Sequence, residues 1–197
     1  MFQFFVTDNI VDLIVDETNC FATQVLQSQT VTRCSTLKAW SPTNRDEMKR
    51  FLGMVIYMGV IQLPEISLYW SKKQLYCGTI ILKTMDRDQF QILMRMLHFA
   101  DNFSPSTSRL AKIDSLMDKL INNFQTVYTP GSELILDETM VPFRGRVKFR
   151  QFIPGKSCRY GCKIFKLCTI DGYTWNFEVY CGVSNVRKYL ELQTRLL

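Results

Sequence analysis

The spacing of hydrophobic residues changes near residue 129 and divides the chain into two parts. Up to Tyr128, apolar residues recur every three or four positions, a period typical of helices that bury one face. After Thr129-Pro130-Gly131 they come in short runs separated by turn residues, which is typical of β-strands. The sequence therefore predicts an α+β fold, with a helical first part followed by an antiparallel sheet.

Capping residues indicate where the expected helices begin. Thr7 or Asp8 can cap a first helix, and residues 43–47 (TNRDE) have the spacing of a capping box for a second. Another helix is expected to open at Asp86, and Lys112–Tyr128 is strongly amphipathic. These segments predict a helical region over residues 1–128. The aromatic pair Tyr69-Trp70 is expected to pack against its core rather than to stack on a nucleic-acid base.

Three apolar runs predict the strands of the second part: Leu134–Leu136, Ile164–Ile170 and Trp175–Val183. Asp171-Gly172 separates the last two runs and is a common hairpin turn. We therefore expect a sheet of about three strands over residues 129–183. The remaining tail, Ser184–Leu197, has an apolar pattern that could begin a helix.

Positive charge is concentrated in one segment of the 197-residue chain, whose formal net charge is +6. No Asp or Glu occurs between Thr139 and Ile170, and the rest of the chain is slightly acidic. A local excess of this kind is expected of a binding surface more than of general solubility. The cations of this segment are Arg144, Arg146, Lys148, Arg150, Lys156, Arg159, Lys163 and Lys166.

Basic residues alternate with other residues from Arg144 to Arg150, so an extended conformation would place them on one face. Phe143 and Phe149 lie in the same stretch. Such a strip could contact successive phosphates of DNA, with a marked dependence on salt. The alternative, which we favour less, is an edge strand that charge protects from aggregation.

A carboxylate at the end of the Leu134–Leu136 run is the candidate for metal chemistry. Asp137 in that position would lie at the rim of a sheet, where it could reach a divalent cation. Metal-assisted hydrolysis needs several carboxylates that converge from different elements. The alternative is that Asp137 and Glu138 are exposed residues at a strand end.

Cysteine usage and hydropathy restrict the class of protein. The seven cysteines are odd in number and include no CxxC pair, which favours reduced thiols in the cytosol or nucleus. The spacing of Cys158 and Cys162 could suit zinc, but no histidine lies near them. The chain has neither a secretory signal at its start nor an apolar run of about 20 residues, so we expect no membrane partner.

The segments DETMVPFRGRVKFRQFIPGKSCRYGCKIFKLC and WNFEVYCG resemble the opening of the catalytic domain of piggyBac-type transposases. Upstream, FFVTDNIVDLIVDETN, EMKRFLGMVIYMGVIQLPEISLYWS and MDRDQFQILMRMLHFADN resemble the same family in the same order. The resemblance covers residues 2 to 182.

This resemblance implies a helical dimerisation and DNA-binding region at 1–128, followed by part of an RNase H-like domain at 129–183. In the complete family, that domain uses three aspartates and two magnesium ions to cut and join DNA. Asp137 matches the first aspartate, which would make it the metal-binding and catalytic position. Neither Asp171 nor Glu178 matches the other two, and the tail 184–197 diverges from the family.

The expected protein is thus a truncated, transposable element-derived one that is not an enzyme and needs no cofactor. DNA is its expected partner, and a second copy of the chain, in a homodimer, is another. Its expected location is the nucleus or the cytoplasm. Two alternatives stay open: an active transposase or nuclease whose missing acids come from another chain, and a fragment with no selected role. The residues expected to contact DNA are Arg144, Arg146, Lys148, Arg150, Lys156, Arg159 and Lys163.

Overall fold

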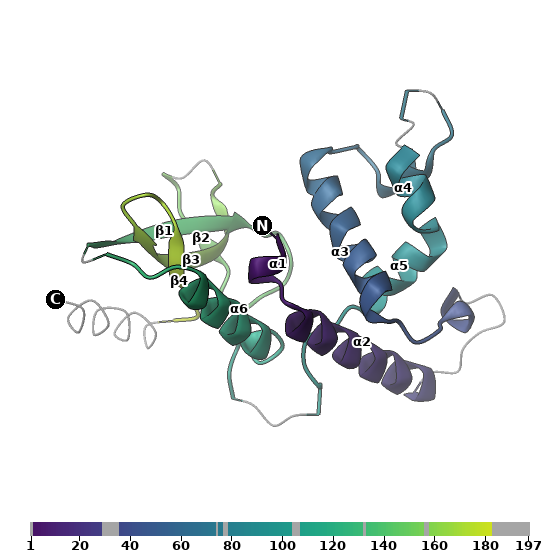
Figure 1. Ribbon diagram of the computed structural model, residues 1–197, viewed down its shortest axis with the longest axis horizontal. Coiled ribbons are helices and arrows are strands. Elements are labelled where there is room, and N and C mark those ends of the chain that lie inside the picture. Colours follow the sequence, from purple (N-terminus) through teal and green to yellow (C-terminus); the bar gives the residue numbers. More distant parts are fainter. Residues whose placement is uncertain are drawn as a thin grey trace. The chain divides into compact units, whose positions relative to one another are not determined.

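A computed structural model describes residues 2–28, 36–73, 75–76, 79–103, 107–131, 133–155 and 158–182. The chain divides into two compact units, shown in Figure 1. The helical unit is Val6–Leu116, and the sheet unit consists of Met1–Phe5 and Met117–Leu197. The predicted α+β class is confirmed. Lys156 and the tail Ser184–Leu197 lie outside the described residues.

The helical unit forms helices where the capping residues predicted them. Asn44 caps α3 by accepting a hydrogen bond from the Glu47 backbone N–H at 3.0 Å, and Asp86 immediately precedes α5. The elements of the unit are α2 (Asp8–Ser28), η1 (Thr36–Ala39), α3 (Arg45–Val60), η2 (Ile66–Trp70), α4 (Thr79–Thr84) and α5 (Arg87–Met96).

Aromatic residues form the centre of the helical unit. The rings of Phe51 and Phe90 are 5.1 Å apart, and the Trp70 ring lies 5.2 Å from Phe90. The Trp70 indole N–H donates to the Met85 carbonyl at 2.8 Å. The Tyr69 hydroxyl, whose residue is 5% exposed, donates to the Ile61 carbonyl at 2.5 Å. The predicted role of Tyr69-Trp70 in core packing is confirmed, because both polar tips are satisfied by backbone.

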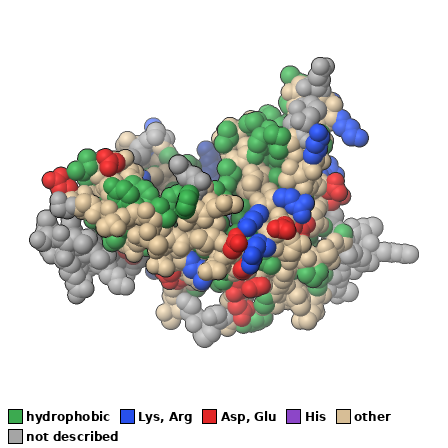
Figure 2. All heavy atoms as spheres, in the orientation of Figure 1, with side chains coloured by type: hydrophobic (Ala, Val, Ile, Leu, Met, Phe, Trp, Pro, Cys, Tyr) green, Lys and Arg blue, Asp and Glu red, His purple; other side chains and the backbone are tan. Residues whose placement is uncertain are grey.

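One face of α3 carries apolar side chains that the helical unit leaves exposed. Val55, Ile56 and Val60 are 38%, 51% and 79% exposed, whereas Phe51 and Met54 of the same helix are buried. Ile56 and Val60 are four positions apart and so share one side of the helix. Figure 2 shows hydrophobic side chains gathered over α3. This helix is therefore apolar on two sides.

The sheet unit is an antiparallel sheet with one long helix. β1 and β4 occupy opposite edges of the central strand β3, since both pair with Ile164. The short β2 pairs with the start of β3 on the side away from β1. The elements are α1 (Phe2–Phe5), α6 (Asp114–Val127), β1 (Leu134–Pro142), β2 (Gln151–Phe152), β3 (Tyr160–Thr169) and β4 (Thr174–Val179).

The three predicted strands and their hairpin are present. Gly172 adopts a φ of +84° in the turn between β3 and β4, and its N–H donates to the Thr169 carbonyl at 2.9 Å. Glycine adopts this conformation without the steric penalty that a Cβ would bring. β1 pairs with β3 without a break from Leu134↔Thr169 to Pro142↔Gly161.

Helix α6 belongs with the sheet rather than with the other helices. The Phe124 ring lies 5.2 Å from Phe5 and 6.0 Å from Phe177 of β4. The Tyr173 hydroxyl donates to the Phe124 carbonyl at 2.8 Å. The change of sequence pattern at residue 129 therefore marks the change from helices to strands. It does not mark the boundary of the two compact units, which lies earlier, between Leu116 and Met117. No helix of the described residues has the length and hydropathy to cross a bilayer.

Candidate nucleic-acid interface

The basic segment after β1 is a loop, which we call the basic loop and define as residues 143–150. β1 ends at Pro142, and the chain turns at Lys148-Phe149. The Arg150 N–H donates to the Val147 carbonyl at 3.4 Å across this turn. The extended strip considered from the sequence is therefore wrong. The physical reason is that Pro142 lacks an N–H for a ladder and that local hydrogen bonds close the turn.

Exposure nevertheless alternates along the basic loop as the sequence pattern predicted. Arg144, Arg146, Lys148 and Arg150 are exposed, and the residues between them are partly buried. No carboxylate in the described part of the chain forms an ion pair with Arg144, Arg146 or Lys148. These three cations are thus available to an anionic ligand.

Arg150 holds the loop in shape. Its Nη1 donates to the carbonyls of Arg144 at 3.1 Å and Gly145 at 3.3 Å. Its guanidinium carbon also lies 5.9 Å from the centre of the Tyr160 ring. Because this side chain satisfies loop carbonyls, it positions the other cations more than it offers a charge of its own.

Gly145 lets the loop close over an aromatic ring. A Cβ at this position would overlap with the outer atoms of the Phe143 ring. Phe143 itself remains 40% exposed. Glycine therefore allows this close approach, whereas a larger residue would displace the end of the exposed Phe143 ring.

Two further cations of the predicted interface lie elsewhere in the sheet unit. Arg159 is exposed in the connection between β2 and β3, where its carbonyl accepts from the Ile153 N–H at 2.9 Å. The Lys163 Nζ lies 2.5 Å from Glu138 Oε2 and 4.6 Å from the Phe165 ring centre. Since its side chain is 21% exposed and already paired, Lys163 is not part of the basic loop surface.

In contrast to the basic loop, the cations near the start of α3 are paired. Arg45 contacts Asp12 at 2.5 Å and Asp8 at 3.4 Å, and Lys49 contacts Asp8 at 2.6 Å. The hydrogen bond from Lys49 lowers the pKa of Asp8, and the pKa of Arg45 is raised chiefly by its bond to Asp12. Figure 2 shows basic and acidic side chains side by side on this surface. The helical unit is therefore locally neutralised there.

Asp137 lies in the middle of β1, an edge strand of the described sheet, and not at a strand end. β1 continues to Pro142, so the expectation of a strand end is wrong; the residues after Asp137 extend the ladder with β3. Its Oδ2 is 3.4 Å from the Nζ of Lys166, the residue directly opposite. Glu138 points to the other face because neighbouring strand residues alternate.

The residues around Asp137 do not complete a divalent metal site. No group of three His, Cys, Asp or Glu side chains in the described ranges could hold a metal ion. Such sites for magnesium in phosphoryl transfer need more than one carboxylate. The described cysteines form no group that could hold zinc: Cys20, Cys158, Cys162 and Cys168 are free thiols, and burial raises the pKa of Cys162.

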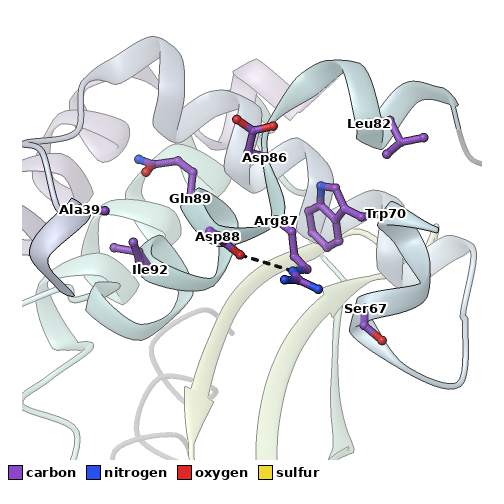
Figure 3. Close-up of a pocket in the computed structure, with 9 residues that line it drawn as sticks. All are labelled: Ala39, Ser67, Trp70, Leu82, Asp86, Arg87, Asp88, Gln89 and Ile92. Atoms are coloured by element: carbon purple, nitrogen blue, oxygen red, sulfur yellow. Dashed lines mark hydrogen bonds and ion pairs between the residues drawn. The ribbon is translucent and has the colours of Figure 1, made fainter. Parts of the chain in front are cut away.

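A pocket of about 580 Å³ lies in the helical unit, between η2, α4 and α5. Figure 3 shows Trp70 beside Arg87, whose Nε is 3.4 Å from the carboxylate of Asp88. The described lining contains neither histidine nor cysteine, and its acids belong to the start of α5. This arrangement offers a helix-start carboxylate, an exposed ion pair and the hydroxyl of Ser67, which donates to Glu65 at 3.2 Å.

Comparison with known proteins shows which family shares these features. The family model described as Transposase IS4 matches residues 1–195. The chain is 28% identical to human PiggyBac transposable element-derived protein 3 over 190 residues, 96% of this chain and 30% of that protein. It is 29% identical to human PiggyBac transposable element-derived protein 2 over 180 residues, 90% of this chain and 28% of that protein.

A solved structure resembles the whole chain. The cryo-EM structure of the piggyBac transposase synaptic complex with hairpin DNA matches with a TM-score of 0.78 and 27% identity, covering 100% of this chain and 42% of that one. The chain thus spans less than a third of the human relatives and less than half of the transposase chain. Because the family model matches nearly all of it, the chain belongs to the Transposase IS4 family, as a member of the piggyBac type.

Proposed function

We propose that this piggyBac transposable element-derived chain binds duplex DNA through its basic loop. The observation that carries the proposal is the exposure of Arg144, Arg146 and Lys148 without a carboxylate partner among the described residues. Contacts of this kind neutralise phosphates and are independent of base sequence. The similar transposase chain was solved in a complex with hairpin DNA, which supports the same class of ligand here.

Arg150 and Arg159 have distinct parts in this proposal. Arg150 fixes the loop backbone through two carbonyls, so its loss would disturb the loop as well as remove a charge. Arg159 is exposed at the neighbouring connection and extends the positive surface. Lys163 is left out because Glu138 already neutralises it.

We further propose that this chain by itself does not cut DNA. Asp137 is the carboxylate that matches the family's first catalytic position, and it is paired with Lys166. In the complete family, bound magnesium would supply the activation of water and the stabilisation of the leaving oxygen. The described residues that surround Asp137 offer too few carboxylates for it. An active enzyme would need acids from another chain or from further sequence.

The DNA-binding test is a titration of a labelled duplex of about 30 base pairs at low salt, followed by fluorescence anisotropy. Arg144→Gln/Arg146→Gln/Lys148→Gln is expected to weaken binding by about tenfold or more, since each lost phosphate contact removes favourable ion release. The matched control, Lys72→Gln/Lys73→Gln/Lys83→Gln, removes the same charge from exposed lysines of the helical unit. Equal weakening by both variants would contradict binding through the basic loop.

Strand cleavage is tested on the same duplex with magnesium or manganese. The proposal expects no nicked or cut product from the chain at any ratio of protein to DNA. Metal-dependent product that disappears in Asp137→Ala would contradict it and would favour the alternative of an active nuclease.

A homodimer is the second partner that the family resemblance predicts, and α3 offers a surface for it. Ile56 and Val60 share one exposed side of α3, and an apolar stripe on a helix suits packing against another helix. We expect the molar mass in solution, measured by light scattering, to rise with concentration. Val60→Gln should suppress that rise; a wild-type monomer at all concentrations would exclude the dimer.

A further inference from the structure

Two aromatic rings lie in contact on the surface where β2 meets β3. Phe152 and Tyr160 are direct partners in the strand register, and their ring centres are 4.7 Å apart at an interplanar angle of 36°. Each residue is 52% exposed. Large aromatic side chains normally gain stability by burial, and this pair leaves half of its surface in water.

One arginine lies beside this pair. The Arg150 guanidinium carbon lies 5.9 Å from the centre of the Tyr160 ring, within the range of a cation–π contact. The same guanidinium donates to the carbonyls of Arg144 and Gly145. Arg150 therefore links the backbone of the basic loop to the aromatic pair. Arg159 directly precedes Tyr160 in extended backbone and so points to the other face, and no acidic residue occurs in the sequence between Thr139 and Ile170.

The chemistry of the pair indicates the kind of ligand. A flat aromatic surface with an arginine beside it suits a nucleobase with its phosphate, because the base stacks on a ring while the phosphate pairs with the arginine. Bases inside a duplex are stacked on their neighbours and have no free face. Unpaired bases have a free face that can stack on an aromatic ring. An apolar protein segment would gain nothing from Arg150 or from the neighbouring basic loop, so the charge favours nucleic acid.

We propose that Phe152 and Tyr160 form a stacking platform for unpaired nucleobases beside the basic loop. The inference rests on the proposed function, since the loop holds the adjoining backbone phosphates. It adds a preference for junctions between duplex and single strand. The duplex part lies on Arg144, Arg146 and Lys148, and the first unpaired bases lie on the aromatic pair.

The test compares two DNA molecules with equal numbers of phosphates. Both share one duplex and carry a single-stranded extension of about ten nucleotides, thymidine in one and abasic in the other. Their affinity ratio isolates the contribution of the bases, because the phosphates are the same. Wild type is expected to bind the thymidine extension about fivefold more tightly or better.

Variants separate stacking from charge. Phe152→Leu/Tyr160→Leu keeps apolar side chains in the hairpin but removes both rings, and should bring the ratio close to one without weakening the abasic molecule. Tyr160→Phe retains the ring and should retain the preference. Arg144→Gln/Arg146→Gln/Lys148→Gln should weaken both molecules and leave the ratio unchanged. Circular dichroism shows whether each variant is folded.

Other results have definite meanings. A wild-type ratio of one, with both molecules bound, overturns the platform and leaves the basic loop as proposed. A ratio retained in the double leucine variant also overturns the platform. A preference that depends on the rings, together with binding that does not depend on the three cations, supports the platform and contradicts the proposed role of the basic loop.

Discussion

Asp137 and Lys166 lie directly opposite each other across β1 and β3, and their side chains form an ion pair with Oδ2 and Nζ 3.4 Å apart. The carboxylate that family position marks as a metal ligand is therefore engaged with an ammonium group. A divalent cation placed beside it would be repelled by Lys166. The pair thus weakens any hold on metal that Asp137 alone would have.

We therefore expect no magnesium binding at Asp137 that would raise the unfolding temperature of the protein. A ligand stabilises a fold only as far as it binds the folded state, so a site with weak affinity adds little at millimolar concentration. The unfolding temperature should shift equally with magnesium in wild type and in Asp137→Asn. A magnesium-dependent rise that vanishes in Asp137→Asn would show that a metal site forms there.

The Asp137–Lys166 pair itself should contribute little to folding. The Asp137 side chain is 55% exposed and that of Lys166 is 27% exposed, so water screens the attraction. A double-mutant cycle of Asp137→Asn and Lys166→Gln, measured by urea unfolding, should give a coupling below about 1 kcal/mol. A coupling several times larger would mean that the pair is effectively buried.

Gly161 is expected to be essential for the pairing of β1 and β3. A Cβ there would overlap the carbonyl oxygen of Val141 and come within 2.9 Å of its carbonyl carbon, both of them backbone atoms. Backbone cannot yield as a flexible side chain does, so Gly161→Ala should cost about 1–3 kcal/mol in the free energy of unfolding. Gly131→Ala is the control, because nothing lies within 4 Å of its Cβ position. Equal stability of the two variants would contradict this strand contact.

Asp101 is expected to make part of the stability dependent on pH. The Phe103 backbone N–H and the Gln24 side chain donate to its Oδ1 at 3.1 and 3.0 Å, and these bonds lower its pKa from the usual 3.8. Its ionised form is favoured in the fold, so this stabilisation is present above pH 3.8 and is lost as pH falls through the lower folded value. Urea midpoints should fall more between pH 7 and pH 3 for wild type than for Asp101→Asn. An equal fall of the urea midpoint in wild type and in Asp101→Asn would contradict this contribution of Asp101 to the pH dependence.

The sequence was most informative where local chemistry alone decides the structure. The Asn44 cap and the Gly172 turn depend on residues next to them in the chain, and both are present as predicted. The strands followed from apolar runs. The short β2, only two residues long, was missed because it is defined by its partner β3 and has no run of its own.

Features that depend on distant residues were harder to predict. An amphipathic pattern shows that α6 buries one face, but not that Phe124 meets Phe177 of the sheet. Asp137 was expected at a strand end because the apolar run stops there, whereas pairing with β3 carries the strand further. The exposed contact between Phe152 and Tyr160 had no signal in the sequence, since it requires the register of β2 and β3.

The most direct measurement is the salt dependence of duplex binding. We would measure the binding constant over a range of salt concentrations for wild type and for Arg144→Gln/Arg146→Gln/Lys148→Gln. For each protein, the logarithm of the binding constant is plotted against the logarithm of the salt concentration. Three phosphate contacts in the basic loop predict that the slope decreases in magnitude by about 0.9 for each contact removed, or about 2.7 in total. An unchanged slope in the triple variant would contradict DNA binding through the basic loop.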